Sequence, residues 1–447
     1  MSTVKETKGR GSGGERMPSA AKLRQVRWYQ EPRWKRLGAL LVLAVVGAQV
    51  TGVQGTSTDL FYALGENFTG SGIWIWLALC VGVWLIREFL SAPVNGAWTS
   101  VRDQVSPPVA RVRGVWQGDP RLRYGGGGVL LIVLIALPLW VSTYWQQVMV
   151  DQIAIFVLLA IGLNVVIGWA GMLDLGFVAF FAIGAYSAAY WTGSLPVEPP
   201  MVLNTFLVIP IAIVTCLLAG VLLGAPTLRL RGDYLAIVTL GFHEIVYLAA
   251  RNWTDFTGGS RGARMSERFV IDLGFWRFEW GLDPKPYYWL LLGFIVVIIF
   301  LFLRLEHSRV GRAWTAIRED EVAAAATGVN TVRMKLLAFG IGASTSGVAG
   351  VVYASKVAYI SPENFVLLMS ILVLAYVIFG GMGSVPGVLA GAALLVWLPE
   401  FLRDSVDPQD RFMYLGALLV IMMIYRPQGL LPSKRRQREL QLAEVKA

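Results

Sequence analysis

The sequence predicts an all-α polytopic membrane protein with about twelve transmembrane helices. Of its 447 residues, 55% are hydrophobic and 15% are charged, whereas about 25% of the residues in a soluble domain are charged. Apolar runs of close to the roughly 20 residues that cross a hydrocarbon core recur along the chain. The 17 Trp and 48 Gly also fit membrane helices, because aromatic side chains mark the interfaces and small residues let helices pack closely.

The spacing of these runs predicts a ten-span core behind an N-terminal pair of spans. A polar linker and the glycine tract at 125–128 separate the pair from the core. We expect a disordered basic tail at 1–36, a two-span extension with its linker at 37–125, the core at 126–432 and a basic tail at 433–447. The twelve runs are 37–53, 72–90, 127–145, 149–168, 172–191, 202–225, 234–250, 287–304, 336–355, 366–382, 385–402 and 411–425.

The charges between the runs predict that both termini are cytoplasmic. The N-terminal tail carries ten Lys or Arg and three Glu, with no apolar segment of a cleaved signal peptide. The loops at 54–71 and 192–201 contain no Lys or Arg, which assigns them to the outside, whereas the 305–335 loop and the C-terminal tail are basic. The 251–286 loop strains the rule, since it would be external and yet holds six basic residues against five acids.

Two glycine-punctuated segments, 168–186 and 379–394, join paired spans of the core. Such segments are typical of transporters built from internal repeats with broken or re-entrant helices. The alternative is ordinary close packing between helices through small residues. The glycines that we expect to act as hinges or close contacts are Gly168, Gly171, Gly176, Gly380, Gly381, Gly383 and Gly387.

The 311–330 segment predicts an amphipathic helix outside the bilayer, between two spans. Trp314, Ile317 and Val322 recur at helical spacing, and four consecutive charges from Arg318 to Glu321 surround the other face. A helix of three to four turns in this position is suited to contact with another protein. The alternative is a solvated loop helix with no partner.

The residues of a metalloenzyme, a serine hydrolase or an ATPase are incomplete. His243 and Glu244 begin an HExxH zinc motif, but Tyr247 occupies the position of the second histidine. Ser344 and Ser346 lie near glycine without a suitable histidine partner. No GxxxxGK[ST] loop is present, so that any ATP-driven work requires a partner. The net charge of the chain is +10, but its basic residues lie between apolar spans. They therefore indicate membrane topology rather than nucleic-acid binding.

Polar residues within the spans are the candidates for a translocation pathway. Asn164, His243 and Glu244 lie in or at the ends of apolar runs. A charged side chain at the bilayer centre costs about 2.5–3.5 kcal/mol on insertion scales, so such groups usually face a bundle interior or a wet cavity. For Glu244 the alternative is a hydrogen bond within the bundle, and Asp174 fits a helix N-cap better than a substrate contact.

Several long motifs resemble the LivM-type permease subunits of branched-chain amino acid ABC transporters. The resemblance covers the chain from about residue 127 onward and extends into the N-terminal pair, which is similar to the extension of longer members. It is carried by GLNVVIGWAGMLDLGFVAFFAIGAY at 162–186, PTLRLRGDYLAIVTLGFHEIV at 226–246, GRAWTAIREDEVAAAATGVN at 311–330, ISPENF at 360–365, VIFGGMGSVPGVLAGA at 377–392 and YRPQGLLP at 425–432.

The resemblance implies a multi-pass subunit of the bacterial inner membrane that imports branched-chain or related amino acids. Its partners would be a LivH-like second permease, two ATP-binding subunits, a periplasmic solute-binding protein and membrane lipid, with no nucleic acid. ATP and Mg would be bound by the partner ATPases, and this chain would hold no cofactor and no metal. The 251–286 loop is our candidate dock for the binding protein.

By the same resemblance, the 311–330 helix corresponds to the segment that couples to the ATPases. The general importer pattern of Glu-Ala-Ala followed by Gly is matched only loosely, because Val322 follows Glu321 and Gly328 comes one residue late. The residues that we expect at the ATPase contact are Trp314, Ile317, Arg318, Glu319, Asp320, Glu321, Ala324 and Gly328.

Two departures from the family pattern concern the substrate more than the fold. His243 and Tyr247 stand where the family usually has a small residue and Arg, and Arg261-Gly262-Ala263 replaces an Asn-Gly-Leu or Asn-Gly-Ile run. Separately, the internal carboxylates would allow an ion-gradient-driven secondary transporter or channel for small solutes, which remains the alternative function. It would leave the 311–330 helix without a purpose.

Overall fold

The structure is a computed structural model in which contacts divide the chain into two compact units, Met1–Gly127 and Gly128–Ala447. The tails expected at 1–36 and 433–447 lie outside the described residues, and the first two apolar runs are described at twelve single positions only. Apart from those positions, the described residues are 120–227, 233–265, 268–272, 277–281, 283–404, 406–426 and 428–432.

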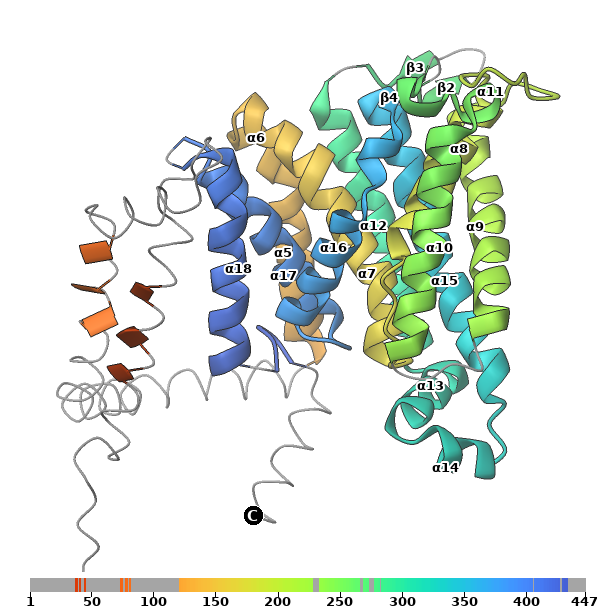
Figure 1. The fold of residues 1–447 in the computed structure, drawn as a ribbon. Coiled ribbons are helices and arrows are strands. Elements are labelled where there is room, and N and C mark those ends of the chain that lie inside the picture. The colour runs from red at the N-terminus through yellow and green to blue at the C-terminus, as the bar shows by residue number, and fades with distance from the viewer. Residues whose placement is uncertain are drawn as a thin grey trace, which may run out of the picture. The chain divides into compact units, whose positions relative to one another are not determined.

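Helices make up most of the described residues of the second unit (Figure 1). Most of them run up and down the bundle, and apolar sequence of about 20 residues favours this form in a membrane. Their bounds are α5 (Pro120–Trp140), α6 (Thr143–Val148), η3 (Met149–Ala154), α7 (Ile155–Leu163), η4 (Asn164–Trp169), α8 (Phe177–Trp191), α9 (Thr205–Thr227), α10 (Asp233–Asn252), α12 (Pro284–Glu306), α13 (Arg309–Glu319), α14 (Glu321–Ala326), α15 (Thr331–Val357), α16 (Leu367–Gly380), α17 (Val385–Phe401) and α18 (Pro408–Tyr425).

The two ends of the bundle differ in structure (Figure 1). At one end lie two antiparallel ribbons, β1 pairing with β4 and β2 with β3. Helices α13 and α14 project at the opposite end, which we call the α13–α14 end. The elements of the strand end are α11 (Thr254–Thr257), η5 (Gly259–Arg261), β1 (Ala263–Arg264), β2 (Val270–Asp272), β3 (Arg277–Glu279), β4 (Tyr359–Ile360) and η6 (Pro362–Phe365).

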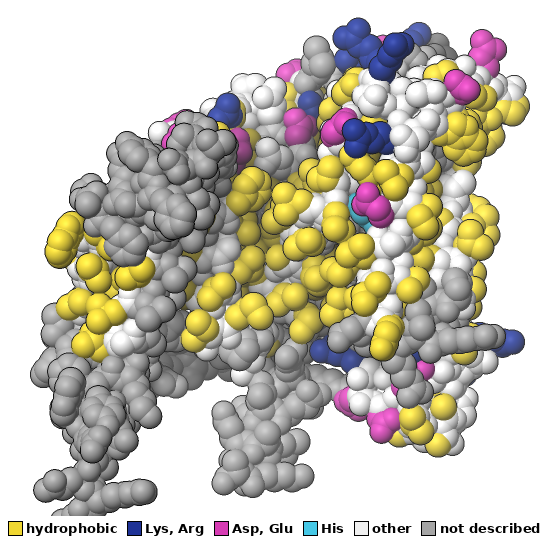
Figure 2. Space-filling model, in the orientation of Figure 1, with side chains coloured by type: hydrophobic (Ala, Val, Ile, Leu, Met, Phe, Trp, Pro, Cys, Tyr) yellow, Lys and Arg dark blue, Asp and Glu magenta, His cyan; other side chains and the backbone are white. Residues whose placement is uncertain are grey.

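Among the described residues, six helices are long and apolar enough to cross a membrane. Figure 2 shows apolar side chains over the middle of one face of the bundle, with charged side chains gathered mainly towards its two ends. The protein is therefore a polytopic, mostly helical membrane protein, as the composition predicts. The six helices are Thr143–Trp169, Thr205–Ala225, Tyr234–Asn252, Pro284–Glu306, Thr331–Val357 and Pro362–Gly380, and shorter apolar helices cover Gly127–Trp140, Phe177–Trp191 and Val385–Phe401.

The core of the unit is built on the two longest of these helices. Thr143–Trp169 and α15 each have 27 residues. In their apolar 18-residue stretches, 78% and 72% are buried, against 22% to 39% in the other four helices. Glycines on α15 allow this burial. A Cβ added at Gly184 of α8 would lie 2.5 Å from the carbonyl oxygen of Gly347. Backbone contact of this kind replaces side-chain interdigitation where helices pack in a membrane.

The two long helices begin similar successions of elements that run in opposite directions. Thr143–Trp169 ends at the α13–α14 end, where Trp169 stacks on Trp314, and is followed by the non-helical residues 170–176 and the 15-residue α8. Helix α15 begins at the α13–α14 end, and is followed by β4, the short turn η6 and the 14-residue α16. Each long helix is thus followed by an interruption and by a shorter apolar helix.

The two glycine-punctuated segments differ in structure. Residues 170–176, within the 168–186 segment, interrupt the helical path. Residues 379–394 instead hold the tight turn between α16 and α17. Glycine spacing cannot separate the two cases, because an interrupted helix and a tight turn both need close backbone approach.

We predict that Gly184→Ala destabilises the bundle, because its Cβ would push against the Gly347 carbonyl oxygen at a rigid helix crossing. Overpacking of this kind costs about 1–3 kcal/mol. Gly241→Ala is the matched control, since nothing lies within 4 Å of its added Cβ and alanine favours a helix. The measurement is the thermal unfolding midpoint in detergent. A Gly184→Ala midpoint equal to that of the control would refute the close-packing account.

Candidate functional site

The 311–330 segment forms two short helices rather than the single helix that its periodicity predicts. Ser308 starts α13, where its hydroxyl oxygen accepts hydrogen bonds from the backbone N–H groups of Val310 (3.1 Å) and Gly311 (3.3 Å). The chain becomes extended at Asp320, with φ −154° and ψ 109°. The Asp320 carboxylate then caps α14 by accepting from Val322 N (2.8 Å) and Ala323 N (3.0 Å). An acceptor side chain at this position ends one helix and starts the next.

The apolar stripe of the segment packs on the bundle of its own chain. Trp314, Ile317 and Ala324 are all buried. The Trp314 indole N–H donates to the carbonyl oxygen of Met334 at 2.7 Å, and its ring stacks on Trp169 with 6.2 Å between centroids and 19° between planes. These three residues therefore do not form the exposed surface that we expected them to offer a partner.

Arg318 connects α13 to the glycine-rich connections of the core. Its Nη1 donates to the carbonyl oxygen of Gly168. A Cβ at Gly171, where φ is +72°, would lie 2.7 Å from the Arg318 side chain, and one at Gly383, where φ is +84°, would lie 3.2 Å from its Nη1. Only glycine suits both positions, because the backbone is left-handed and the guanidinium group needs the space.

Asn164 completes this junction. It is buried at the start of η4, and its Oδ1 accepts a hydrogen bond from Gly383 N at 2.8 Å. The end of the first long helix is thus tied to the turn between α16 and α17, and both are tied to α13. We call Asn164, Gly168, Trp314, Arg318 and Gly383 the coupling junction.

The other predicted glycines pack the same region. Gly176 lies against the backbone of Thr239 on α10. Gly380 and Gly387 face each other so closely that each occupies the place of the other's Cβ. Gly381 adopts φ +114° beside Leu431. The sequence pointed to these glycines, but not to the Asn164–Gly383 bond that connects residues 219 positions apart.

The outer surface of the segment consists of the remaining residues. Glu319, Asp320 and Gly328 are exposed, and Val322 is 63% exposed. Glu321 is half-buried and pairs with Lys335 of α15 at 2.5 Å. The exposed face therefore combines two acids with the apolar surface of Val322 and the neighbouring alanines.

The predicted pathway residues do not form one cluster. Asn164 belongs to the coupling junction. His243 lies near the middle of α10, 1% exposed, beside a small hollow lined by α8 and η6, and neither ring nitrogen has a hydrogen-bond partner among the described residues. Glu244 is its exposed neighbour. Asp174 accepts from Gly176 N at 2.8 Å just before α8, but Gly176 and not Asp174 is the N-cap residue of α8, so the expected N-cap role is wrong.

Known proteins similar to this chain are membrane transport components. Residues 148–426 match the family described as branched-chain amino acid transport system / permease component. The chain is 39% identical to the LivM permease protein of Salmonella typhimurium and 40% identical to that of Escherichia coli. Each match covers 338 residues, 71% of this chain and 77% of the relative. The LivH permease protein of Escherichia coli is 32% identical over 145 residues, which are 32% of this chain and 46% of LivH. No solved structure matches the chain significantly.

We predict that Arg318→Ala loosens α13 from the bundle. Arg318 is exposed, so water screens its hydrogen bond and the loss should cost about 1 kcal/mol. Amide hydrogen exchange of residues 311–319 should therefore become about fivefold faster. Arg312→Ala is the control. Arg312 also lies on α13, but its Nη1 donates to the carbonyl oxygen of His307, just before the same helix, and not to the core. Unchanged exchange in Arg318→Ala would contradict the role of this contact.

Proposed function

The chain belongs to the branched-chain amino acid transport permease family, and we propose that it is the transmembrane permease subunit of an ATP-driven importer for branched-chain or related amino acids. The observation that carries this proposal is the coupling junction. It connects the outer surface of α13 and α14 to the ends of both long helices. An ion-gradient-driven transporter has no comparable use for such a junction.

The proposed assembly contains this chain and a LivH-like permease in the bacterial inner membrane. Two ATPases, which bind ATP and Mg, would contact the exposed face of α13 and α14, and a periplasmic binding protein would deliver the substrate. Twelve spans with cytoplasmic termini, and with the two-span extension at 37–125, accommodate this arrangement. The strand end would then face the periplasm, because it lies opposite α13 and α14 (Figure 1).

Coupling follows from the bonds of the junction. When the ATPases close, they displace α13 and α14. Arg318 and Trp314 would transmit this displacement to η4 and to the start of α15, while the Asn164–Gly383 bond carries the turn between α16 and α17 along. Packed helices shift as rigid bodies between discrete arrangements, which opens the path to alternate sides.

The face of α10 supports a pathway or partner interface at His243 and Glu244. Only 28% of the apolar 18-residue stretch of α10 is buried, and Tyr234, Ile237 and Ile245 are largely exposed. Glu244 is exposed on the same helix. A carboxylate left in lipid would be costly, so a protein or aqueous surface is expected to cover it. The second permease is the natural candidate.

We predict that Val322→Glu abolishes ATPase binding. The side chain is exposed on α14, so the substitution adds a charge to the docking face without disturbing the Asp320 cap or the Glu321–Lys335 pair. A desolvated, unpaired charge at an interface costs at least 2 kcal/mol, which is more than tenfold in affinity. The measurement is co-purification of the ATPases with the two co-expressed permeases.

Val197→Glu is the matched control, because Val197 is an exposed valine (38%) in the loop between α8 and α9, away from α14. It should leave ATPase binding unchanged. If the wild-type chain with its LivH-like partner retains no ATPase, the importer proposal fails.

We predict that Glu244→Lys lowers uptake at least tenfold while ATPase assembly persists, because a reversed charge would face the covered surface of α10. Glu198→Lys is the control, since Glu198 is exposed in the loop between α8 and α9. The measurement is uptake of radiolabelled leucine by cells that depend on the complex. Normal uptake in Glu244→Lys would exclude Glu244 from the pathway and from the interface.

A further inference from the structure

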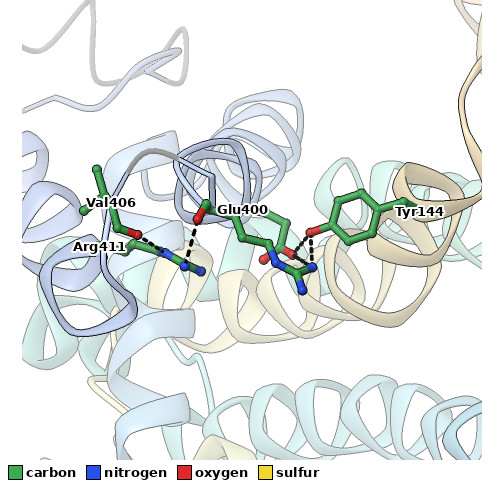
Figure 3. A network of polar contacts seen from close by, with 5 residues as sticks. Tyr144, Glu400, Val406 and Arg411 are labelled. Carbon is green, nitrogen blue, oxygen red and sulfur yellow. Dashed lines mark hydrogen bonds and ion pairs between the residues drawn. The ribbon is translucent and has the colours of Figure 1, made fainter.

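A cavity of about 490 Å³ lies within the second unit, apart from the coupling junction and from His243. Its walls come from η3, α7, α8, α15, α16, α17 and α18, with Asn364 of η6 at one side. The volume is within the range of about 300–1,000 Å³ that is usual for small-molecule sites. Of its charged residues, Glu400 and Arg411 lie where α17 ends and α18 begins (Figures 1 and 3), and Asp151 lies on η3.

Charge and apolarity are separated along the depth of the cavity. In each of three wall helices, a charged residue lines the cavity, and an apolar residue four positions away lines it one turn nearer the α13–α14 end. The pairs are Asp151 and Ile155, Glu400 and Val396, and Arg411 and Leu415. Four positions bring side chains onto the same helix face. We call the end of the cavity with the three charged residues its mouth and the apolar end its floor.

The cationic group of the mouth is held in place by neutral partners. Arg411 donates from Nε to the carbonyl oxygen of Val406 at 3.0 Å and from Nη2 to that of Arg403 at 3.1 Å (Figure 3). Among the described residues, no carboxylate pairs with the Arg411 guanidinium. Its orientation is therefore fixed while its positive charge stays unneutralised, which suits the binding of an anion.

The two carboxylates of the mouth differ in how they are held. Glu400 Oε1 accepts a hydrogen bond from the Tyr144 hydroxyl, and Arg403 Nη1 lies 3.5 Å from it (Figure 3). Asp151 forms a salt bridge with Lys356, whose Nζ lies 3.9 Å from Oδ1. Oδ1 is fully buried and has no hydrogen-bond donor among the described residues, so a ligand in the cavity would reach this carboxylate through its other oxygen.

The floor is suited to an aliphatic side chain. Phe156 and Tyr376 meet edge to face there, with 5.7 Å between ring centroids, beside Leu372 and Val396. Burial of a Leu or Val side chain against such walls contributes about 1.5–3 kcal/mol. An amphipathic molecule with both charges at one end matches the whole cavity.

We propose that this cavity binds a zwitterion with an apolar tail, a free aliphatic amino acid, within a single permease subunit. Its ammonium group would lie between Asp151 and Glu400, its carboxylate against Arg411, and its side chain on the floor. This inference rests on the proposed function and adds a substrate site to it. An aminophospholipid headgroup shares the same chemistry, and the test distinguishes the two sources.

The test is equilibrium binding of radiolabelled L-leucine to the full chain, co-purified with its LivH-like partner and the ATPases, in nanodiscs of phosphatidylglycerol. Leucine binding is expected for the wild type, and Glu400→Gln and Arg411→Gln should each weaken it at least tenfold. Leucinamide, which lacks the carboxylate, should compete poorly with leucine for the wild type. Arg264→Gln is the control, since Arg264 is exposed on β1 at the strand end and does not line the cavity.

Leu415→Trp tests the floor without a change of charge, because the larger side chain would fill the apolar region. It should abolish leucine binding while the ATPases still co-purify. If leucine binds equally well to the wild type and to Glu400→Gln, Arg411→Gln and Leu415→Trp, the proposed site is wrong. Leucine binding that is lost when phosphatidylethanolamine replaces half of the phosphatidylglycerol would assign the cavity to the lipid headgroup and overturn the amino acid site.

Failure of this inference is distinct from failure of the proposed function. A complex that retains the ATPases but binds no leucine in the absence of aminophospholipid would remove the cavity site and leave the importer intact. Absence of both leucine binding and ATPase co-purification would remove both.

Discussion

The structure depends on a junction between the α13–α14 segment and the two most buried helices of the bundle, with Trp314 buried in it and Arg318 at its exposed edge. Trp314 of α13 is fully buried. Its indole N–H donates to the carbonyl oxygen of Met334, and its ring stacks on Trp169. Arg318 adds a charged hydrogen bond to Gly168. Neither contact can be lost cheaply, because the first loss leaves a buried donor unpaired and the second separates an arginine from its acceptor. Helix α13 therefore belongs to the core and is not a loosely attached loop.

This junction also explains where the glycines are. Arg318 reaches Gly168 only because Gly171 and Gly383 leave room and adopt backbone conformations that other residues avoid. Asn164 then joins η4 to the turn before α17. Both segments change from helix to irregular backbone at the same place, and the backbone polar groups freed there need hydrogen-bond partners. The Arg318 and Asn164 side chains supply those groups.

The sequence predicts most of the fold and a smaller share of the site. Length, apolar runs and family motifs predict a polytopic permease, because twenty apolar residues have few alternatives in a membrane. Helical periodicity also places Trp314 and Ile317 on one face. It cannot say whether that face covers a partner or the chain's own bundle, since both bury apolar surface equally well.

Other features depend on contacts that the sequence does not reveal. The break at Asp320 is a local capping choice within a run of charges that also fits a continuous helix. The Asn164–Gly383 bond spans 219 positions, and no spacing rule connects them. The charged mouth of the cavity was missed for a related reason. Asp151, Glu400 and Arg411 lie at the ends of separate apolar runs, where charges ordinarily indicate topology.

The two long helices connect the coupling junction to the cavity. The first long helix carries Asp151 at the cavity mouth and Trp169 beside the coupling junction, eighteen positions or about 27 Å apart at 1.5 Å per residue. Helix α15 carries Met334 beside the coupling junction and Tyr353 in the cavity wall. The π-helical turns η3 and η4 hold Asp151 and Trp169, and such turns are frequent at functional sites. In the proposed importer, a displacement of α13 would therefore act on helices whose far ends form walls of the cavity.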